Sequence, residues 1–123
     1  MVKNQLLLAD DDELLAALLK FRFIKEGYTV HQCKDGKEVK EYLTTHEPDI
    51  IVSDIMMPYF SGIELIGHVR NDLGSKTPII IISSAGNEEN VLSAFDMGAN
   101  DFISKPVSPA ELMVRVARQI CKT

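Results

Sequence analysis

The regular alternation of short apolar runs with helical patterns is the feature that most constrains how this chain can fold. Five apolar runs, each about the length of a β-strand, cover approximately residues 5–8, 28–33, 49–53, 78–82 and 101–104. Helical patterns lie between and after them, near residues 12–26, 35–45, 62–73, 87–97 and 108–121. Consecutive strand–helix units predict an α/β fold, in which right-handed crossovers join parallel strands and helices cover both faces of the sheet.

Residues that typically begin and end helices support these limits. Residues 61–64 and 108–111 have the capping-box pattern, and the second segment also has proline at its first helical position. Three of the helical patterns are followed by a glycine, which favours a left-handed helix end: Gly27, Gly74 and Gly98. The isoleucines at 79–82 show no polar alternation, which predicts a strand covered on both faces.

The composition fits one domain of 123 residues, which is long enough to form a core without staples. The net charge of -5 argues against nucleic-acid binding by this domain, because such a surface is basic. No apolar stretch approaches the length of a membrane span, and the first residues lack the apolar segment of a signal peptide. The cysteines, Cys33 and Cys121, form no disulfide framework, so we expect a reducing, cytoplasmic location.

Residues able to bind a metal ion or a phosphate follow several of the apolar runs. The first run is followed by Asp10, Asp11 and Asp12, the third by Asp54 and the fifth by Lys105. Parallel strands place these positions at one edge of the sheet, where α/β folds bind ligands. Clustered carboxylates repel one another, and a hard divalent cation is the simplest way to keep them ionised. The pattern therefore indicates magnesium.

Each of these residues taken alone has a simpler explanation. Acidic residues before a helix are common N-caps, and an aspartate after a strand is often a turn residue. Ser83 ends the fourth run, where a hydroxyl can cap the next helix, and a single lysine is commonly solvated. Their coincidence at one predicted edge favours a site. The histidines have no zinc-ligand spacing and are expected at the surface: His31, His46 and His68.

Taken together, the motifs of this chain resemble the receiver domain of two-component response regulators. They follow the family's order and spacing along essentially the whole chain: Asp10-Asp11, Asp54 through Pro58 with Gly62, Ser83, Gly98-Ala99 and Lys105-Pro106. The resemblance implies one receiver domain over residues 1–123. It also implies a flavodoxin-like (βα)5 fold, a doubly wound parallel sheet with strand order 2-1-3-4-5.

The resemblance further implies what the acidic residues do. Asp54 accepts a phosphoryl group from a sensor histidine kinase or a histidine phosphotransfer protein. Magnesium is the cofactor, bound by Asp11, by Asp54 and by the backbone carbonyl of Met56, while Asp10 orients one of its waters. Magnesium prefers few carboxylates and retained waters, which suits this set.

Three other residues complete the implied mechanism. Lys105 supplies a positive charge to one phosphoryl oxygen, and Ser83 donates its hydroxyl to another. Phe102 stands where the family has an aromatic residue, often tyrosine, whose rotamer changes as the residue at Ser83 moves. The bond between Lys105 and Pro106 is expected to be cis. Phosphorylation is then expected to shift the conformation of one face, formed by residues 87–97, 101–104 and 108–121.

Other functions fit these residues less well. A degenerate receiver that serves only as a protein-interaction module would not need the complete acidic, hydroxyl and lysine set. A haloacid-dehalogenase-like phosphatase would have a second aspartate where this chain has Met56. A flavodoxin-type electron carrier would need a phosphate-binding loop in place of Asp10, Asp11 and Asp12, which would repel a flavin phosphate. We therefore expect a signalling switch rather than an enzyme.

The resemblance also bears on oligomeric state and output. In receivers attached to winged-helix DNA-binding domains, activation promotes a symmetric dimer held by charge pairs on the 87–121 face. This chain has part of that set, in Asp101, Glu111 and Arg115, but Val91 replaces a basic residue and Asn100 replaces an aspartate. Exposed pairs stabilise weakly. We expect a monomer, at most a weak dimer on activation, and an output domain that is attached or separate.

Overall fold

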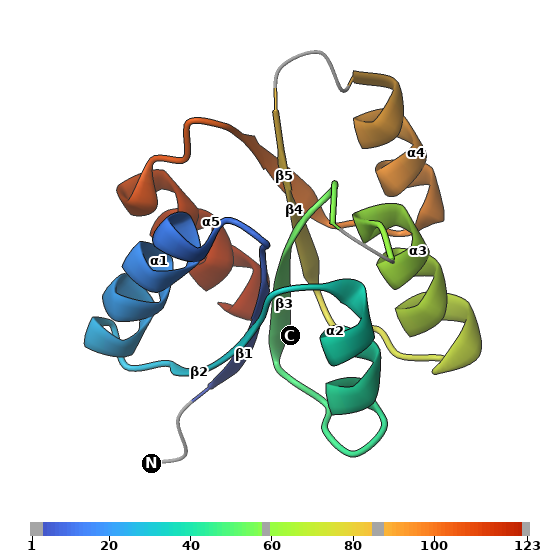
Figure 1. The fold of residues 1–123 in the computed structure, drawn as a ribbon, viewed down its shortest axis with the longest axis horizontal. Helices are drawn as coiled ribbons and strands as arrows, with labels where there is room; N and C mark the ends of the chain where they lie inside the picture. Colours follow the sequence, from blue (N-terminus) through green and yellow to red (C-terminus); the bar gives the residue numbers. More distant parts are fainter. Residues whose placement is uncertain (1–3, 58–59, 85–87, 122–123) are drawn as a thin grey trace.

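The computed structural model describes residues 4–57, 60–84 and 88–121, and it has the predicted alternation of strands and helices (Figure 1). The strands are β1 (Gln5–Ala9), β2 (Thr29–Cys33), β3 (Ile50–Asp54), β4 (Ile79–Ser83) and β5 (Asp101–Ser104). The helices are α1 (Glu13–Lys25), α2 (Gly36–Leu43), α3 (Gly62–Gly67), α4 (Glu88–Met97) and α5 (Pro109–Cys121), with a short π-helix, η1 (His68–Asp72), after α3. Among these described helices, none is long and apolar enough to cross a bilayer.

The strands form one parallel sheet with the predicted order β2-β1-β3-β4-β5. Helices α1 and α5 cover one face of the sheet, and α2, α3 and α4 cover the other (Figure 1). The strand order reverses between β1 and β3, where Ala9 lies in register with Ser53. The residues that follow this pair, Asp10 and Asp54, therefore come to lie at the switch point, where such sheets bind ligands.

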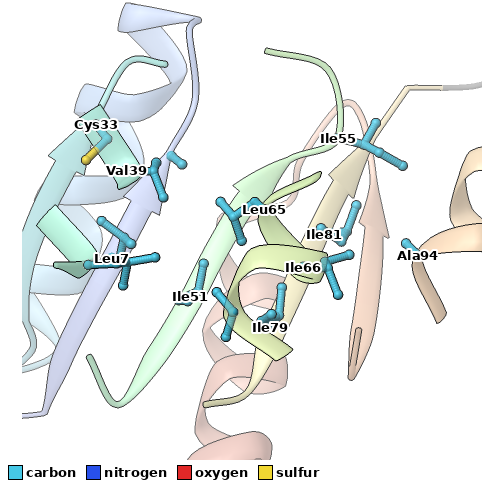
Figure 2. Close-up of a cluster of buried hydrophobic side chains, with 13 residues drawn as sticks. Leu7, Cys33, Val39, Ile51, Ile55, Leu65, Ile66, Ile79, Ile81 and Ala94 are labelled. Atoms are coloured by element: carbon cyan, nitrogen blue, oxygen red, sulfur yellow. The ribbon is translucent and has the colours of Figure 1, made fainter. Parts of the chain in front are cut away.

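The two faces of the central strands are buried in separate hydrophobic clusters. Leu6 and Leu8 of β1 belong to the cluster beneath α1 and α5, whereas Leu7 belongs to the cluster beneath α2, α3 and α4. Figure 2 shows the second cluster, in which isoleucines of β3 and β4 pack with Leu65 and Ile66 of α3. All residues of β4 are buried, which confirms the prediction that both of its faces are covered.

Side-chain caps begin several helices where the sequence predicts them. Ser61 and Glu64 form a complete capping box at the start of α3. At the start of α5, the hydroxyl of Ser108 accepts a bond from the Glu111 backbone N–H, while the Glu111 carboxylate pairs with Arg115. The glycines expected at helix ends all have positive φ: Gly27, Gly74 and Gly98.

The third helix departs from the continuous α-helix expected over residues 62–73. Its last turn, η1, contains a bond from the Leu73 N–H to the His68 carbonyl, five residues back, which is the wider turn of a π-helix. From this turn the Arg70 guanidinium reaches the carbonyls of Ser75 and Thr77 in the following loop. The apolar spacing of so short a segment does not distinguish the two helix types.

Candidate functional site

Three carboxylates meet at the carboxyl edge of the central strands. Asp10, Asp11 and Asp54 each place one carboxylate oxygen within 4.8 Å of the others. The backbone extends the sheet ladder at this edge, because the N–H of Asp10 donates to the Cys33 carbonyl at 3.1 Å. The structure thus brings these three carboxylates together at one edge, as the strand pattern predicts.

Asp54 is nearly enclosed, with 4% of its surface exposed, and both of its oxygens have partners. Its Oδ1 accepts a bond from the Met56 backbone N–H at 3.0 Å, and its Oδ2 accepts one from the Lys105 ammonium at 2.7 Å. Burial lowers the pKa of Lys105, but the bond to Asp54 and the charges of the neighbouring aspartates outweigh burial and raise it. The ammonium therefore remains a fixed positive charge beside the carboxylate.

Glycine at position 62 is needed for the close approach of the loop after β3. A Cβ atom on Gly62 would lie 2.8 Å from the Asp54 carbonyl oxygen and 2.8 Å from Cα of Ile55. The N–H of Gly62 donates to the Ile55 carbonyl at 2.9 Å. A side chain at this position would push the loop away from Asp54, so this glycine shapes the site through its backbone.

Asp10 is fully buried and only partly satisfied. Its Oδ1 accepts a bond from the Asp12 backbone N–H at 2.8 Å, but its Oδ2 has no hydrogen-bond partner among the described residues. Burial is the main reason that the pKa of Asp10 rises from 3.8 to about 6. The Asp54 charge raises this pKa further, whereas the bond from Asp12 lowers it. An unpartnered buried oxygen beside two other carboxylates suits a hard divalent cation, so the residues present fit magnesium.

Asp12 is not part of this carboxylate cluster. Its carboxylate accepts a bond from the Leu15 N–H at 3.1 Å and caps the N-terminus of α1. The simpler explanation, an acidic N-cap, therefore applies to Asp12, whereas Asp10 and Asp11 belong to the carboxylate cluster.

Ser83 and Phe102 lie on the neighbouring strands. Ser83 ends β4 with 2% of its surface exposed, and its hydroxyl donates to the Ser84 carbonyl at 3.2 Å. Phe102 in β5 points outward, with 39% exposed, and meets the Phe95 ring of α4 edge-on at a centroid distance of 5.9 Å. The sequence does not indicate a role for Phe95, because the spacing of two aromatics on different elements does not specify a contact between them.

The strand order also brings Lys105 into the site. Its backbone N–H donates to the Ser83 carbonyl at 2.8 Å, and the Lys105–Pro106 peptide bond is cis, as predicted. The histidines lie elsewhere: His31 and His46 stack on the two sides of Tyr42, and His68 bonds to Asp72.

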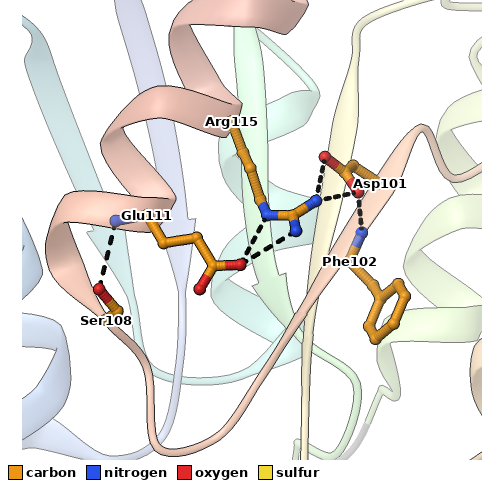
Figure 3. A network of polar contacts seen from close by, with 5 residues as sticks. All are labelled: Asp101, Phe102, Ser108, Glu111 and Arg115. Carbon is orange, nitrogen blue, oxygen red and sulfur yellow. Dashed lines mark hydrogen bonds and ion pairs between the residues drawn. The ribbon is translucent and has the colours of Figure 1, made fainter.

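The charged residues singled out on α5 and β5 pair with one another within the chain (Figure 3). The Arg115 guanidinium contacts Asp101 at 2.9 Å and Glu111 at 3.0 Å. Bonds to both carboxylates raise the pKa of Arg115. These side chains therefore already form ion pairs within the chain, without a second copy of the domain.

The other conspicuous surface is an apolar stripe on α1, a name we keep for four exposed side chains on one side of that helix. They are Leu14, Leu18, Phe21 and Ile24, with 81%, 50%, 62% and 50% of their surfaces exposed. Helix α1 begins directly after the three aspartates that follow β1 (Figure 1). Leu14 lies in the first turn of α1 and Ile24 in the last, so the stripe extends along the helix away from the site edge. Exposed apolar side chains grouped on one side of a helix are a feature of many protein-binding surfaces.

Comparisons with known proteins point to one family. The family model of the response regulator receiver domain matches residues 6–117. Response regulator GtcR of Aneurinibacillus migulanus is 35% identical over 119 residues, covering 97% of this chain and 48% of GtcR. Transcriptional regulatory protein SrrA of Staphylococcus aureus is 32% identical over 122 residues, covering 99% of this chain and 50% of SrrA. The chain thus spans about half the length of these curated relatives.

Solved structures show the same fold. The receiver domain of Francisella response regulator 1452 superposes with a TM-score of 0.90 at 35% identity, covering 98% of both chains. Full-length FixJ from B. japonicum gives a TM-score of 0.91 at 27% identity, covering 99% of this chain and 60% of FixJ. The family model matches nearly the whole sequence, and the strands have the order β2-β1-β3-β4-β5 that the resemblance implies. This chain therefore belongs to the receiver domains of two-component response regulators.

Proposed function

We propose that this domain is a signalling switch that accepts a phosphoryl group on Asp54 from a histidine kinase or a histidine phosphotransfer protein. The observation that carries the proposal is the enclosed Asp54 carboxylate, bonded to Lys105 and adjacent to Asp10 and Asp11. In the transfer, a carboxylate oxygen of Asp54 forms a bond to phosphorus as the bond between phosphorus and the donor imidazole nitrogen breaks. The imidazole leaves with the electron pair of that bond.

The main obstacle to this reaction is charge repulsion, because an anionic carboxylate attacks an anionic phosphoryl group. Lys105 offers a positive charge next to Asp54, and the Met56 backbone N–H orients the same carboxylate. Asp10, Asp11 and Asp54, with the Met56 carbonyl, would hold magnesium, which when bound supplies further positive charge for the phosphoryl oxygens. The residues of this chain thus position the nucleophile and offset the charge.

The signal is then passed to the face formed by α4, β5 and α5. In the unphosphorylated domain the Ser83 hydroxyl donates to its neighbour's carbonyl, and it can exchange this bond for one to a phosphoryl oxygen. Phe102, on the adjacent strand, moves as Ser83 moves. Phosphorylation in this way shifts the population between two arrangements of the face.

Incorporation from a small phosphodonor tests the acceptor. Acetyl phosphate with magnesium should phosphorylate the wild-type protein and the Asp12→Asn variant, but not Asp54→Asn, and removal of magnesium should abolish the reaction. Asp12→Asn is a matched control, since it removes a neighbouring charge while asparagine still caps α1. Full phosphorylation of Asp54→Asn would contradict the assignment.

The phosphodonor protein has to cover the edge that holds Asp54, and the apolar stripe of α1 extends from that edge. We therefore propose that the donor packs on this stripe. Leu18→Glu should slow transfer from a phosphorylated donor protein while leaving acetyl phosphate reactivity unchanged. Leu92→Glu, the same change at an exposed position of α4 on the other face of the sheet, is the control. Equal slowing of both variants would exclude a specific role for the stripe.

A phosphatase that uses an aspartyl phosphate has less support. The position two residues after Asp54 is Met56, whose exposed side chain offers no carboxylate for general acid or base catalysis. We propose instead that the domain acts through an output domain, attached or separate, because it aligns with about half of relatives such as SrrA.

A further inference from the structure

The only described side-chain ring contact between α4 and β5 joins Phe95 to Phe102. Their ring planes are inclined by 88° at a centroid distance of 5.9 Å, the edge-to-face geometry that aromatic pairs favour. The two side chains are 40% and 39% exposed, so neither is locked into the core. The outward position of the Phe102 ring therefore depends on its edge-to-face contact with the Phe95 ring.

Helix α4 is seated mainly through its C-terminal end. It buries one residue, Ala94, whereas α1 and α5 bury three residues each. Near its end, the Cε atom of Met97 approaches Gly67 so closely that a Cβ there would lie 2.9 Å away. Phe95 belongs to this same turn, so its position is set by the contacts that hold the end of the helix.

Arg70 fixes the backbone of that turn. Its guanidinium donates through Nε at 3.1 Å and Nη2 at 2.9 Å to the Gly98 carbonyl, which directly follows α4. The same Nη2 donates to Asn100 Oδ1 at 2.9 Å, and that oxygen also accepts from the Ile79 N–H of β4. The end of α4 is thus tied to the sheet from outside the phosphorylation site.

We propose that Phe95, presented by this clamped turn, is a positioning residue that holds the Phe102 ring outward and thereby sets how readily the domain switches. The inference rests on the proposed function, in which Phe102 moves on phosphorylation. Loss of the edge contact removes stabilisation of the outward ring alone. It should shift the equilibrium toward the activated arrangement by roughly two- to tenfold, the factor that corresponds to one aromatic pair.

Three variants separate this role from simple packing. Phe95→Leu removes the ring but keeps an apolar side chain, Phe95→Tyr keeps the ring, and Leu92→Ala truncates another exposed side chain of α4. Fluorine NMR of protein labelled with 4-fluorophenylalanine reports the Phe102 ring, whose signal is assigned with Phe102→Leu. Titration with beryllofluoride and magnesium reports the equilibrium of the switch.

We expect Phe95→Leu to move the Phe102 signal in the resting protein and to tighten the apparent beryllofluoride affinity roughly two- to tenfold. Phe95→Tyr and Leu92→Ala should match the wild type in both measurements. If the wild type responds but Phe95→Leu leaves the signal or the affinity unchanged, the inference is wrong and the proposed function stands. If the wild type does not bind beryllofluoride, the proposed function fails, and the role of Phe95 in switching fails with it.

Discussion

Neutralising Asp10 should stabilise the metal-free domain, although the residue belongs to the proposed site. Asp10 is fully buried, and one of its oxygens has no partner among the described residues. In Asp10→Asn, the amide oxygen can keep the bond from the Asp12 N–H. The new NH2 group is uncharged and lies beside the carboxylates of Asp11 and Asp54, each of which has an oxygen within 4.8 Å of an Asp10 oxygen. The substitution therefore removes a buried negative charge that burial and the Asp54 charge destabilise.

The magnitude follows from the pKa of Asp10, which burial raises from 3.8 to about 6 in the folded protein. A folded-state pKa above the unfolded value means that the folded state binds more protons, so stability falls as pH rises. The penalty is absent below pH 3.8, grows between 3.8 and about 6, and is constant above that range. Its full size is about 3 kcal/mol, or roughly 10 °C in melting temperature for a domain of this length.

Thermal and urea unfolding between pH 4 and 8, in the presence of a chelator, measures this difference. Asp10→Asn should equal the wild type near pH 4 and exceed it by about 3 kcal/mol at pH 8. Magnesium should stabilise the wild type more than the variant, because it binds the folded carboxylates. Asp12→Asn, at an exposed cap, should change stability by less than about 0.5 kcal/mol. A wild type as stable as Asp10→Asn at pH 8 without metal would refute the reasoning.

Four further outcomes are expected. Lys105→Ala should slow phosphorylation by acetyl phosphate roughly 100-fold, the usual cost of losing one preorganised charge donor. Ser83→Ala should keep its melting temperature within a few degrees of the wild type and lose the conformational response to beryllofluoride. Gly98→Ala should lower the free energy of unfolding by more than about 1 kcal/mol in a urea titration, because φ of Gly98 is +119° and a Cβ would lie 2.9 Å from Nε of Arg70. Gly27→Ala is the control and should cost less, because Gly27 has φ +100° but no atom within 4 Å of the added Cβ. Sedimentation should show a monomer without beryllofluoride and at most a weak dimer with it, since Arg115 is already paired within the chain; a tight activated dimer abolished by Arg115→Glu would contradict this.

The sequence alone determined the features that depend on local pattern. Apolar periodicity predicted the strands and helices, since burial on one or both faces dictates which positions are apolar. Ser61 and the glycines after the helices predicted the helix ends through bonds and φ values that involve only neighbouring residues. The chain also predicted that Asp54 and Lys105 share an edge, because parallel strands align their carboxyl ends.

Only the tertiary structure decided which of these residues act together. It separated Asp12, an N-cap, from Asp10, whose unpartnered buried oxygen and raised pKa arise from the packing of three strand ends. It also revealed the bonds from Arg70 to the Gly98 carbonyl and the contact of Phe95 with Phe102, which join residues on different elements. Desolvation, charge proximity and ring contacts depend on distances in space, and spacing along a chain does not specify them.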